Sequence, residues 1–258
     1  MAENDNAVLL GRKIFFLHPS AIVQNQIISA LAQEEFEVYI AKDEVKLREK
    51  LKKYSDSIVF ACISEGMREN EWEDWVRSVT VNPETSGVSI GIIASGLVEA
   101  TRRKYILQQK IACGYTVLKS DINEVIKQLV TILNNKNAKG RRKYIRALTG
   151  NEPNTTVNIP MNGTFVNGKL KDISVVGFSC AFEEDPGLVK NSLFGNMQVR
   201  LQSQLLKVEG IVFGSRMDSG EKTYVILFTQ RIDPEVRTKI RKYIQTNLQS
   251  VMDHELGV

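Results

Sequence analysis

The pattern of hydrophobic and polar residues changes near the middle of the chain. In the first half, short runs of consecutive apolar residues alternate with longer segments whose apolar residues recur every three or four positions. The runs are typical of strands buried on both faces, and the second spacing is typical of amphipathic helices. We expect strands at 13–17, 37–41, 57–63, 88–94 and 115–118, and helices at 24–33, 45–54, 71–79, 101–111 and 122–133. Five strand–helix units of this length predict a doubly wound parallel sheet.

In the second half, the pattern becomes that of short strands joined by tight turns. Asn-Gly, Pro-Gly and Asp-Ser-Gly signals separate apolar runs, some of which alternate strictly with polar residues. We expect six strands, at 157–159, 163–173, 177–182, 197–201, 205–213 and 223–228. Six short strands with tight turns predict a small antiparallel β-barrel. Asp233 and Pro234 form an N-cap and N1 pair, which predicts a C-terminal helix packed on the barrel or on a neighbour.

Length and composition agree with two domains of different class. The chain has 258 residues, of which 43% are hydrophobic, enough for two cores. We place the boundary so that an α/β domain covers residues 1–136 and a β-barrel domain with a C-terminal helix covers 137–258. No run of about 18 apolar residues occurs, so we expect no membrane insertion.

The N-terminus and the cysteines favour a cytoplasmic location. The first six residues are polar and acidic, unlike a secretory signal. Cys62, Cys113 and Cys180 are odd in number, widely spaced and mostly within apolar runs. We expect buried free thiols in a reducing compartment rather than a disulfide framework or a zinc site.

Basic residues gather in one short segment rather than over the whole chain. The net charge of +4 is too small to favour general nucleic-acid binding, but six lysines and arginines lie within residues 136–146. Arg142 and Arg146 form an RxxxR motif, and Asp172, Ser174 and Gly177 form a D-x-S-x-x-G motif. RxxxR alone is a weak signal, because a second copy occurs within residues 237–241, in a helical pattern that indicates a solvated face.

The two motifs, in this order and 26 residues apart (172 − 146 = 26), resemble those of the PilZ domain, which binds the bacterial second messenger cyclic di-GMP. The resemblance covers about residues 139–248 and implies that cyclic di-GMP is the ligand. A guanidinium group pairs bidentately with a phosphate, or with O6 and N7 of guanine, which suits Arg142 and Arg146. Asp172 is our candidate acceptor for the guanine N1–H and N2 amino groups.

Ser174, Gly177 and Arg141 complete the candidate ligand-binding set. The Ser174 hydroxyl either donates to a phosphate or base, or closes the turn on its own backbone. Gly177 permits a positive φ and close approach of the backbone to a ring system. Arg141 adds a third guanidinium, which would help to neutralise two stacked ligands with about four negative charges. We therefore expect two ligands per chain; the alternative is that Arg141 simply faces solvent.

The first half resembles the receiver domain of response regulators in length and element order. A working receiver needs acidic residues after the first strand to hold Mg²⁺ and an aspartate after the third to accept a phosphoryl group. Residues 17–20 contain no acid, and residues 60–64 contain none before Glu65. Ser95 and Lys119 stand at two other matched positions, but without carboxylates they support neither metal binding nor phosphotransfer. We therefore expect a pseudo-receiver that serves docking.

No catalytic pattern stands out in the chain, which contains no P-loop, nucleophile elbow or H-E-x-x-H motif. We predict a non-enzyme without a cofactor or metal. Its function would be that of a cyclic di-GMP receptor that changes its domain arrangement on binding and regulates an effector protein. The resemblance allows motility, adhesion or polysaccharide synthesis as the output.

Two alternative functions remain open. In the first, the chain is a PilZ-fold protein-interaction adaptor that no longer binds the nucleotide. In the second, the basic segment of residues 136–146 binds RNA or DNA. Against nucleic acid, aromatic residues are scarce in the basic segment, which contains only Tyr144.

Overall fold

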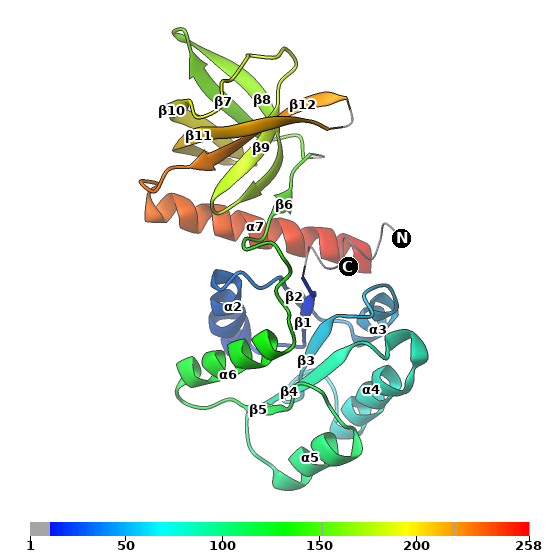
Figure 1. Cartoon of the computed structure of the whole chain (residues 1–258). Helices are drawn as coiled ribbons and strands as arrows, with labels where there is room; N and C mark the ends of the chain where they lie inside the picture. Colours follow the sequence, from blue (N-terminus) through cyan, green and yellow to red (C-terminus); the bar gives the residue numbers. More distant parts are fainter. Residues whose placement is uncertain (1–10, 151, 219, 258) are drawn as a thin grey trace. The chain divides into compact units, whose positions relative to one another are not determined.

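The computed structural model describes residues 11–150, 152–218 and 220–257. The chain forms two compact units (Figure 1). The first comprises the described residues up to Lys143 together with those from Gln249 onward, and the second comprises Tyr144–Leu248. The boundary between residues 136 and 137 stays a prediction, because a compact unit need not coincide with an independently folding domain.

The first unit contains a five-stranded parallel sheet with the strand order β2-β1-β3-β4-β5. Ile14 on β1 pairs with Val38 on β2 and with Ile58 on β3, so β1 lies inside the sheet and β2 at its edge. The strands are β1 (Ile14–Leu17), β2 (Val38–Ala41), β3 (Ile58–Cys62), β4 (Ser89–Ala94) and β5 (Tyr115–Val117). All five lie where the apolar runs predicted them, and they confirm the doubly wound sheet.

Helices cover both faces of this sheet (Figure 1). Asp43 caps α3 by accepting hydrogen bonds from the backbone N–H groups of Val45 and Lys46. The helices are η1 (Val23–Ile28), α2 (Ser29–Gln33), α3 (Glu44–Lys53), α4 (Glu69–Val81), η2 (Pro83–Thr85), α5 (Glu99–Arg103), η3 (Lys104–Gln108) and α6 (Ile122–Asn135). The segments predicted as single helices at 24–33 and 101–111 differ in detail, because each contains a wider π-helical stretch, η1 and η3.

The second unit is a closed antiparallel barrel. Its strands follow the order β6-β8-β7-β10-β11-β12-β9, and pairing between β8 and β9 closes a ring of six. The strands are β6 (Ala147–Leu148), β7 (Thr155–Met161), β8 (Thr164–Ser174), β9 (Gly177–Ala181), β10 (Leu193–Leu201), β11 (Gln204–Asp218) and β12 (Glu221–Phe228). The six-stranded barrel is confirmed, and the two-residue strand β6, which pairs with β8, was not predicted.

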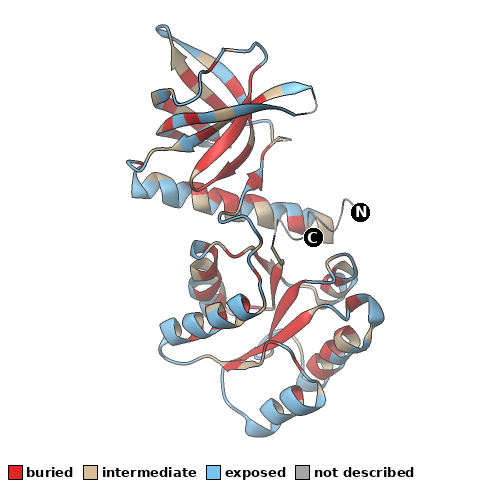
Figure 2. Cartoon of the chain, viewed as in Figure 1, coloured by how far each residue is buried: buried red, intermediate tan, exposed pale blue. Residues whose placement is uncertain are grey.

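Local sequence signals explain the turns and the core of the barrel. Asn162 and Gly163 both have positive φ, 50° and 83°, and close the two-residue turn between β7 and β8, as the Asn-Gly signal predicts. Inward-facing residues of the strands form the core, seen as the buried stretches of Figure 2. Helix α7 (Pro234–Leu256) starts at the predicted proline and contributes Ile240 and Ile244 to this core.

The C-terminal residues of the first unit contact its edge strand and α3. The Gln249 carboxamide accepts a hydrogen bond from the Ile40 N–H and donates one to the Ile40 carbonyl, both at 2.9 Å. The carboxamide thus pairs with the free edge of β2 much as a neighbouring strand would. Glu255 accepts from Tyr54 Oη at 2.7 Å and lies 3.1 Å from Lys50 Nζ and 3.3 Å from Lys53 Nζ.

The cysteines fit the predicted free thiols. Cys62, Cys113 and Cys180 are all buried and unbridged. Burial raises the pKa of Cys62 to about 12, so its thiol is poorly reactive at neutral pH. Among the described residues, no helix combines the length and apolar character that a membrane span requires.

Candidate functional site

Strand β6 brings the two sequence motifs together on the barrel. Ala147 pairs with Ile173 and Leu148 pairs with Asp172, so Arg146, immediately before β6, lies beside the end of β8. Nη1 of Arg146 donates to Oδ1 of Asp172 at 3.3 Å. The Asp172 side chain is only 13% exposed, whereas that of Arg146 is 40% exposed. A buried carboxylate therefore holds a guanidinium group that remains open to solvent.

The second oxygen of Asp172 is fixed by a residue that neither motif contains. The Ser179 hydroxyl donates to Oδ2 of Asp172 at 2.5 Å, and the two residues are register partners on β9 and β8. Both residues are buried. The sequence did carry a signal for Ser179, since it is a polar residue inside the apolar run 177–181. Its hydrogen bond holds the Asp172 carboxylate in one orientation.

Ser174 closes the turn between β8 and β9. Its hydroxyl donates to the Gly177 carbonyl at 3.1 Å and accepts from the Val176 N–H at 3.4 Å. Of the two roles considered for Ser174, the structure shows closure of the turn on its own backbone. Ser174 is buried, so its hydroxyl is occupied inside the hairpin.

Gly177 does not use the positive φ that a glycine permits. It stands in β9 opposite Leu227 of β12, and a Cβ atom here would lie 2.3 Å from the Ile226 carbonyl oxygen. The close approach is therefore real, but it is to the backbone of the neighbouring strand. A glycine is required because the strands pack too closely for any side chain.

Arg141 and Arg142 lie in an irregular segment before β6, ahead of the cluster that Arg146, Asp172 and Ser179 form. Both are exposed, and neither makes an ion pair with a residue in the part of the chain that the structure describes. Arg142 is four residues before Arg146 (146 − 142 = 4), a span of at most about 14 Å of chain. Their guanidinium groups are thus free for an external anion.

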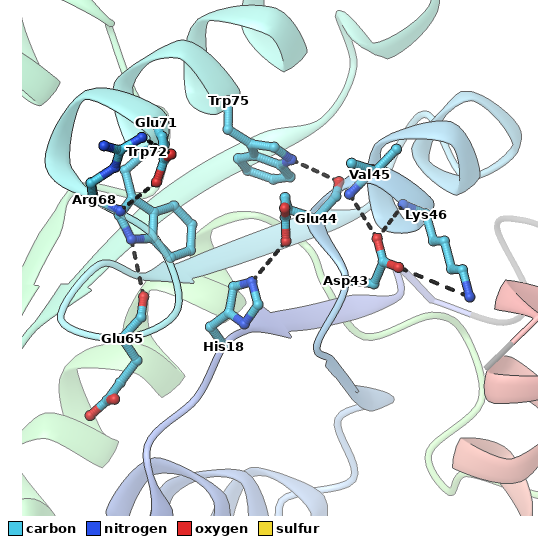
Figure 3. Close-up of polar contacts among 10 residues, drawn as sticks. All are labelled: His18, Asp43, Glu44, Val45, Lys46, Glu65, Arg68, Glu71, Trp72 and Trp75. Atoms are coloured by element: carbon cyan, nitrogen blue, oxygen red, sulfur yellow. Dashed lines mark hydrogen bonds and ion pairs between the residues drawn. The ribbon is translucent and has the colours of Figure 1, made fainter.

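Figure 3 shows polar contacts at the carboxyl edge of the parallel sheet, the edge at which a receiver would have its acidic residues. His18, directly after β1, lies with Nε2 3.1 Å from Glu44 Oε2. Its ring also makes an edge contact with Trp72, at a centroid distance of 5.7 Å. His18 is thus held by a carboxylate and an aromatic ring.

The other receiver-matched positions have local partners. Glu65 uses its backbone carbonyl to accept from Nε1 of Trp72 at 3.1 Å, and its carboxylate points away (Figure 3). Lys119 pairs with Glu124 at 3.1 Å, and the Ser95 N–H donates to the Ser64 hydroxyl at 2.7 Å. The described residues contain no cluster of three or more side chains able to hold a metal ion.

Comparisons with known proteins give one family match and several similar solved structures. Residues 140–246 match the model of the PilZ domain family. No curated protein sequence matches the chain. Similar solved structures include Escherichia coli YcgR in complex with cyclic di-GMP, with 15% identity, a TM-score of 0.39, and coverage of 45% of this chain and 50% of YcgR.

Two further structures are similar over parts of the chain. The K. pneumonia MrkH complex with cyclic di-GMP is 17% identical, with a TM-score of 0.36 and coverage of 46% of this chain and 55% of MrkH. The Mn²⁺-bound response regulator Rcp1 is 12% identical, with a TM-score of 0.39 and coverage of 48% of this chain and 92% of Rcp1. The match thus spans only about half the length of YcgR and of MrkH. Residues 140–246 of this chain form a PilZ domain that follows a receiver-like α/β unit.

Proposed function

We propose that this chain is a cyclic di-GMP receptor, with a binding site that comprises Arg141, Arg142, Arg146, Asp172, Ser174 and Gly177. The observation that carries the proposal is the half-exposed Arg146, held by a buried carboxylate. A mobile surface arginine would lose side-chain entropy on binding an anion, whereas Arg146 is already oriented. Ser174 and Gly177 act as positioning residues, because they shape the hairpin that carries Asp172.

The donors and acceptors of the cluster fit both parts of the ligand. A guanidinium group has five N–H donors, and Arg146 uses one of them on Asp172, so donors remain for a phosphate or for O6 and N7 of guanine. An ionised carboxylate has about four acceptor positions, and Asp172 uses two. The others are left for the N1–H and amino group of guanine.

Binding would also order the segment that contains Arg141 and Arg142. Fixing this segment costs conformational entropy, which charge-assisted hydrogen bonds to a phosphate offset. We propose that ordering of this segment changes the arrangement of the two units, and that this change alters the affinity of the chain for an effector protein. By linkage, that effector tightens ligand binding by the same factor. Arg141 supports a second, stacked ligand.

The receiver-like unit serves docking in this proposal, and the chain is a cytoplasmic non-enzyme without a metal or cofactor. The local partners of His18, Glu65 and Lys119 support a role outside phosphotransfer. An adaptor without ligand affinity is the second candidate, and binding of RNA or DNA by the basic segment is the third.

Calorimetric titration with cyclic di-GMP tests the proposal. We expect micromolar or tighter binding that is lost in Arg142→Ala/Arg146→Ala. The matched control is Arg237→Ala/Lys239→Ala, which removes the same charge from two exposed positions of α7 and should bind like the wild type. No heat with the wild type would support the adaptor. Equal loss in both variants, with a steep salt dependence, would favour non-specific electrostatic binding.

The stoichiometry of binding tests the proposal of two stacked ligands, and small-angle scattering tests the proposed rearrangement of the two units. Two ligands per wild-type chain and one in Arg141→Ala would support stacking, and one ligand in the wild type would exclude it. Small-angle scattering with and without ligand should show different arrangements of the two units. Identical curves at saturation would exclude the proposed rearrangement.

A further inference from the structure

A second candidate site lies in the receiver-like unit, at the carboxyl ends of β3 and β4. It is a pocket of about 280 Å³ with a lining that includes Ser64 and Ser95, which follow these strands, and Trp72 of α4. In open parallel sheets, ligands bind outside the carboxyl ends of the strands at the switch point, here between β1 and β3, and this pocket lies one strand further along the same edge. The volume is just below the usual range of roughly 300–1,000 Å³ for ligand pockets, so the pocket suits a small molecule.

Three aromatic side chains border this pocket, Trp72, Tyr105 and Tyr115, of which the first two are fully buried and Tyr115 is partly exposed. Tyr105 and Tyr115 lie with their ring centroids 6.4 Å apart and their planes tilted by 35°. Tyr105 is fully buried, and its hydroxyl has no hydrogen-bond partner among the residues that the structure describes. Because buried polar groups are nearly always paired, the unmet hydroxyl points to a partner that the chain itself does not supply.

The charge of the pocket is set by Glu69. Its carboxylate accepts one hydrogen bond, from Thr101 Oγ1 at 3.3 Å, and forms no ion pair within the described part of the chain. Two other acids of the neighbouring helices are neutralised, since Lys104 pairs with Glu73 and both Arg102 and Arg103 pair with Glu99.

The negative charge of Glu69 affects the pKa values of Tyr105 and Tyr115. Burial and then the charges of Glu73 and Glu69 raise the pKa of Tyr105. Burial and the charge of Glu69 raise the pKa of Tyr115. Both hydroxyls therefore remain protonated and neutral at physiological pH, and neither adds to or offsets the charge of Glu69.

We infer that this pocket binds a small organic cation, a primary ammonium or guanidinium group on a short apolar stem. The cation would lie against the partly exposed Tyr115 ring and donate N–H bonds to the Glu69 carboxylate and, as it enters the pocket, to the Tyr105 hydroxyl oxygen. A phosphate or carboxylate ligand would instead meet the unneutralised charge of Glu69. A lone carboxylate is too few ligands for Mg²⁺ or Ca²⁺.

Titration of the full chain with n-butylammonium chloride at constant ionic strength tests this site. The readout is the indole N–H signal of Trp72, one of only two tryptophans, assigned with Trp75→Phe. We expect a saturable shift in the millimolar range. Glu69→Gln should weaken binding by roughly fivefold or more, because it removes the charge and keeps the shape. Glu99→Gln, which changes the same charge outside the pocket, should have no more than a small effect.

A hydroxyl variant and a neutral probe complete the test. Tyr105→Phe should weaken binding by roughly threefold without lowering the thermal midpoint, since the hydroxyl has no partner to lose. Neutral n-butanol should bind much more weakly. The inference fails if n-butylammonium gives no saturable shift up to about 0.1 M. It also fails if n-butanol binds equally well or if Glu69→Gln binds as tightly as the wild type.

Discussion

The two units use a carboxylate in opposite ways. On the barrel, Asp172 is buried and already paired, with Arg146 on one oxygen and Ser179 on the other. In the receiver-like unit, Glu69 accepts a hydrogen bond from a hydroxyl and has no cationic partner among the residues that the structure describes. The paired carboxylate positions an arginine, and so the barrel presents positive charge. The unpaired one presents its own negative charge. The identity of an acidic residue therefore says less about its ligand than the group that neutralises it.

Gly177→Ala should have the largest effect on the barrel, because it would disrupt the strand packing beside Asp172. The added Cβ would lie 2.3 Å from the Ile226 carbonyl oxygen and 3.0 Å from the Leu227 Cα, and backbone cannot yield as a flexible side chain does. We expect a loss of about 2–3 kcal/mol in the stability of the barrel. Hydrogen exchange of the β9 and β12 amides measures it for the barrel alone.

Gly214→Ala in β11 is the matched control, because no atom lies within 4 Å of the Cβ it would add. It should leave exchange in β9 and β12 almost unchanged. Equal effects of the two substitutions would show that loss of glycine flexibility, and not the contact with Ile226, is responsible.

Asp172→Asn tests whether the paired carboxylate matters for the ligand. Asparagine keeps the size and can keep the Ser179 bond, but loses the charge that holds Arg146 and accepts guanine N–H groups. We expect affinity for cyclic di-GMP to fall roughly tenfold or more in calorimetry. Asp218→Asn removes an exposed carboxylate whose nearest cation is 3.7 Å away, and should bind normally. Wild-type affinity in Asp172→Asn would remove Asp172 from the site.

The receiver-like unit also contains a paired carboxylate, Glu255, and its effect should depend on pH. Burial raises the pKa of Glu255, but hydrogen bonds from Tyr54, Lys50 and Lys53 outweigh burial and lower the pKa to about 2. A carboxyl group with a lowered folded-state pKa stabilises the fold above its unfolded value of about 4.3. That contribution declines as the pH falls from there towards 2.

Glu255→Gln should therefore destabilise the first unit by roughly 1–2 kcal/mol at pH 7, after allowance for solvent screening. Near pH 2 the difference from the wild type should be much smaller. Hydrogen exchange or denaturant unfolding across this pH range measures the gap. A gap that stays constant with pH would show that the side chain contributes by packing rather than by charge.

The smallest expected effect is that of Ser174→Ala. This variant tests whether the Ser174 hydroxyl shapes the hairpin or contacts the ligand. It removes one donated and one accepted hydrogen bond inside the hairpin, at a cost of about 1 kcal/mol of stability. Affinity for cyclic di-GMP should change by less than about threefold, since the hydroxyl already has its partners. A larger loss of affinity with little loss of stability would place the hydroxyl on the ligand.

Much of the fold was predictable because the periodic signals are long. Buried apolar runs located all five parallel strands, and turn signals such as Asn162-Gly163 located the hairpins of the barrel. Strand β6 was not predictable, because two residues give no alternation. Without it, the contact between Arg146 and Asp172 has no visible cause in the sequence.

The chemistry of the barrel cluster was predictable only in part. The two motifs identified Arg146 and Asp172 as site residues. Ser179 could have been identified because it is a polar residue within an apolar strand. The requirement for Gly177 comes from Ile226, a residue far along the chain that only the closed barrel brings near. In the same way, only the folded structure shows that Glu69 has no cationic partner among the described residues. No local pattern encodes it.

The shortness of β6 has a mechanical consequence. A two-residue strand has few ladder hydrogen bonds, and the other six strands of the barrel are all longer. Tension along the connecting segment would therefore peel β6 from β8 before it disturbed the closed ring. Arg146, directly adjoining β6, would be pulled away from Asp172 in the same event. The contact between Arg146 and Asp172 would then be lost while the closed ring of strands stays folded.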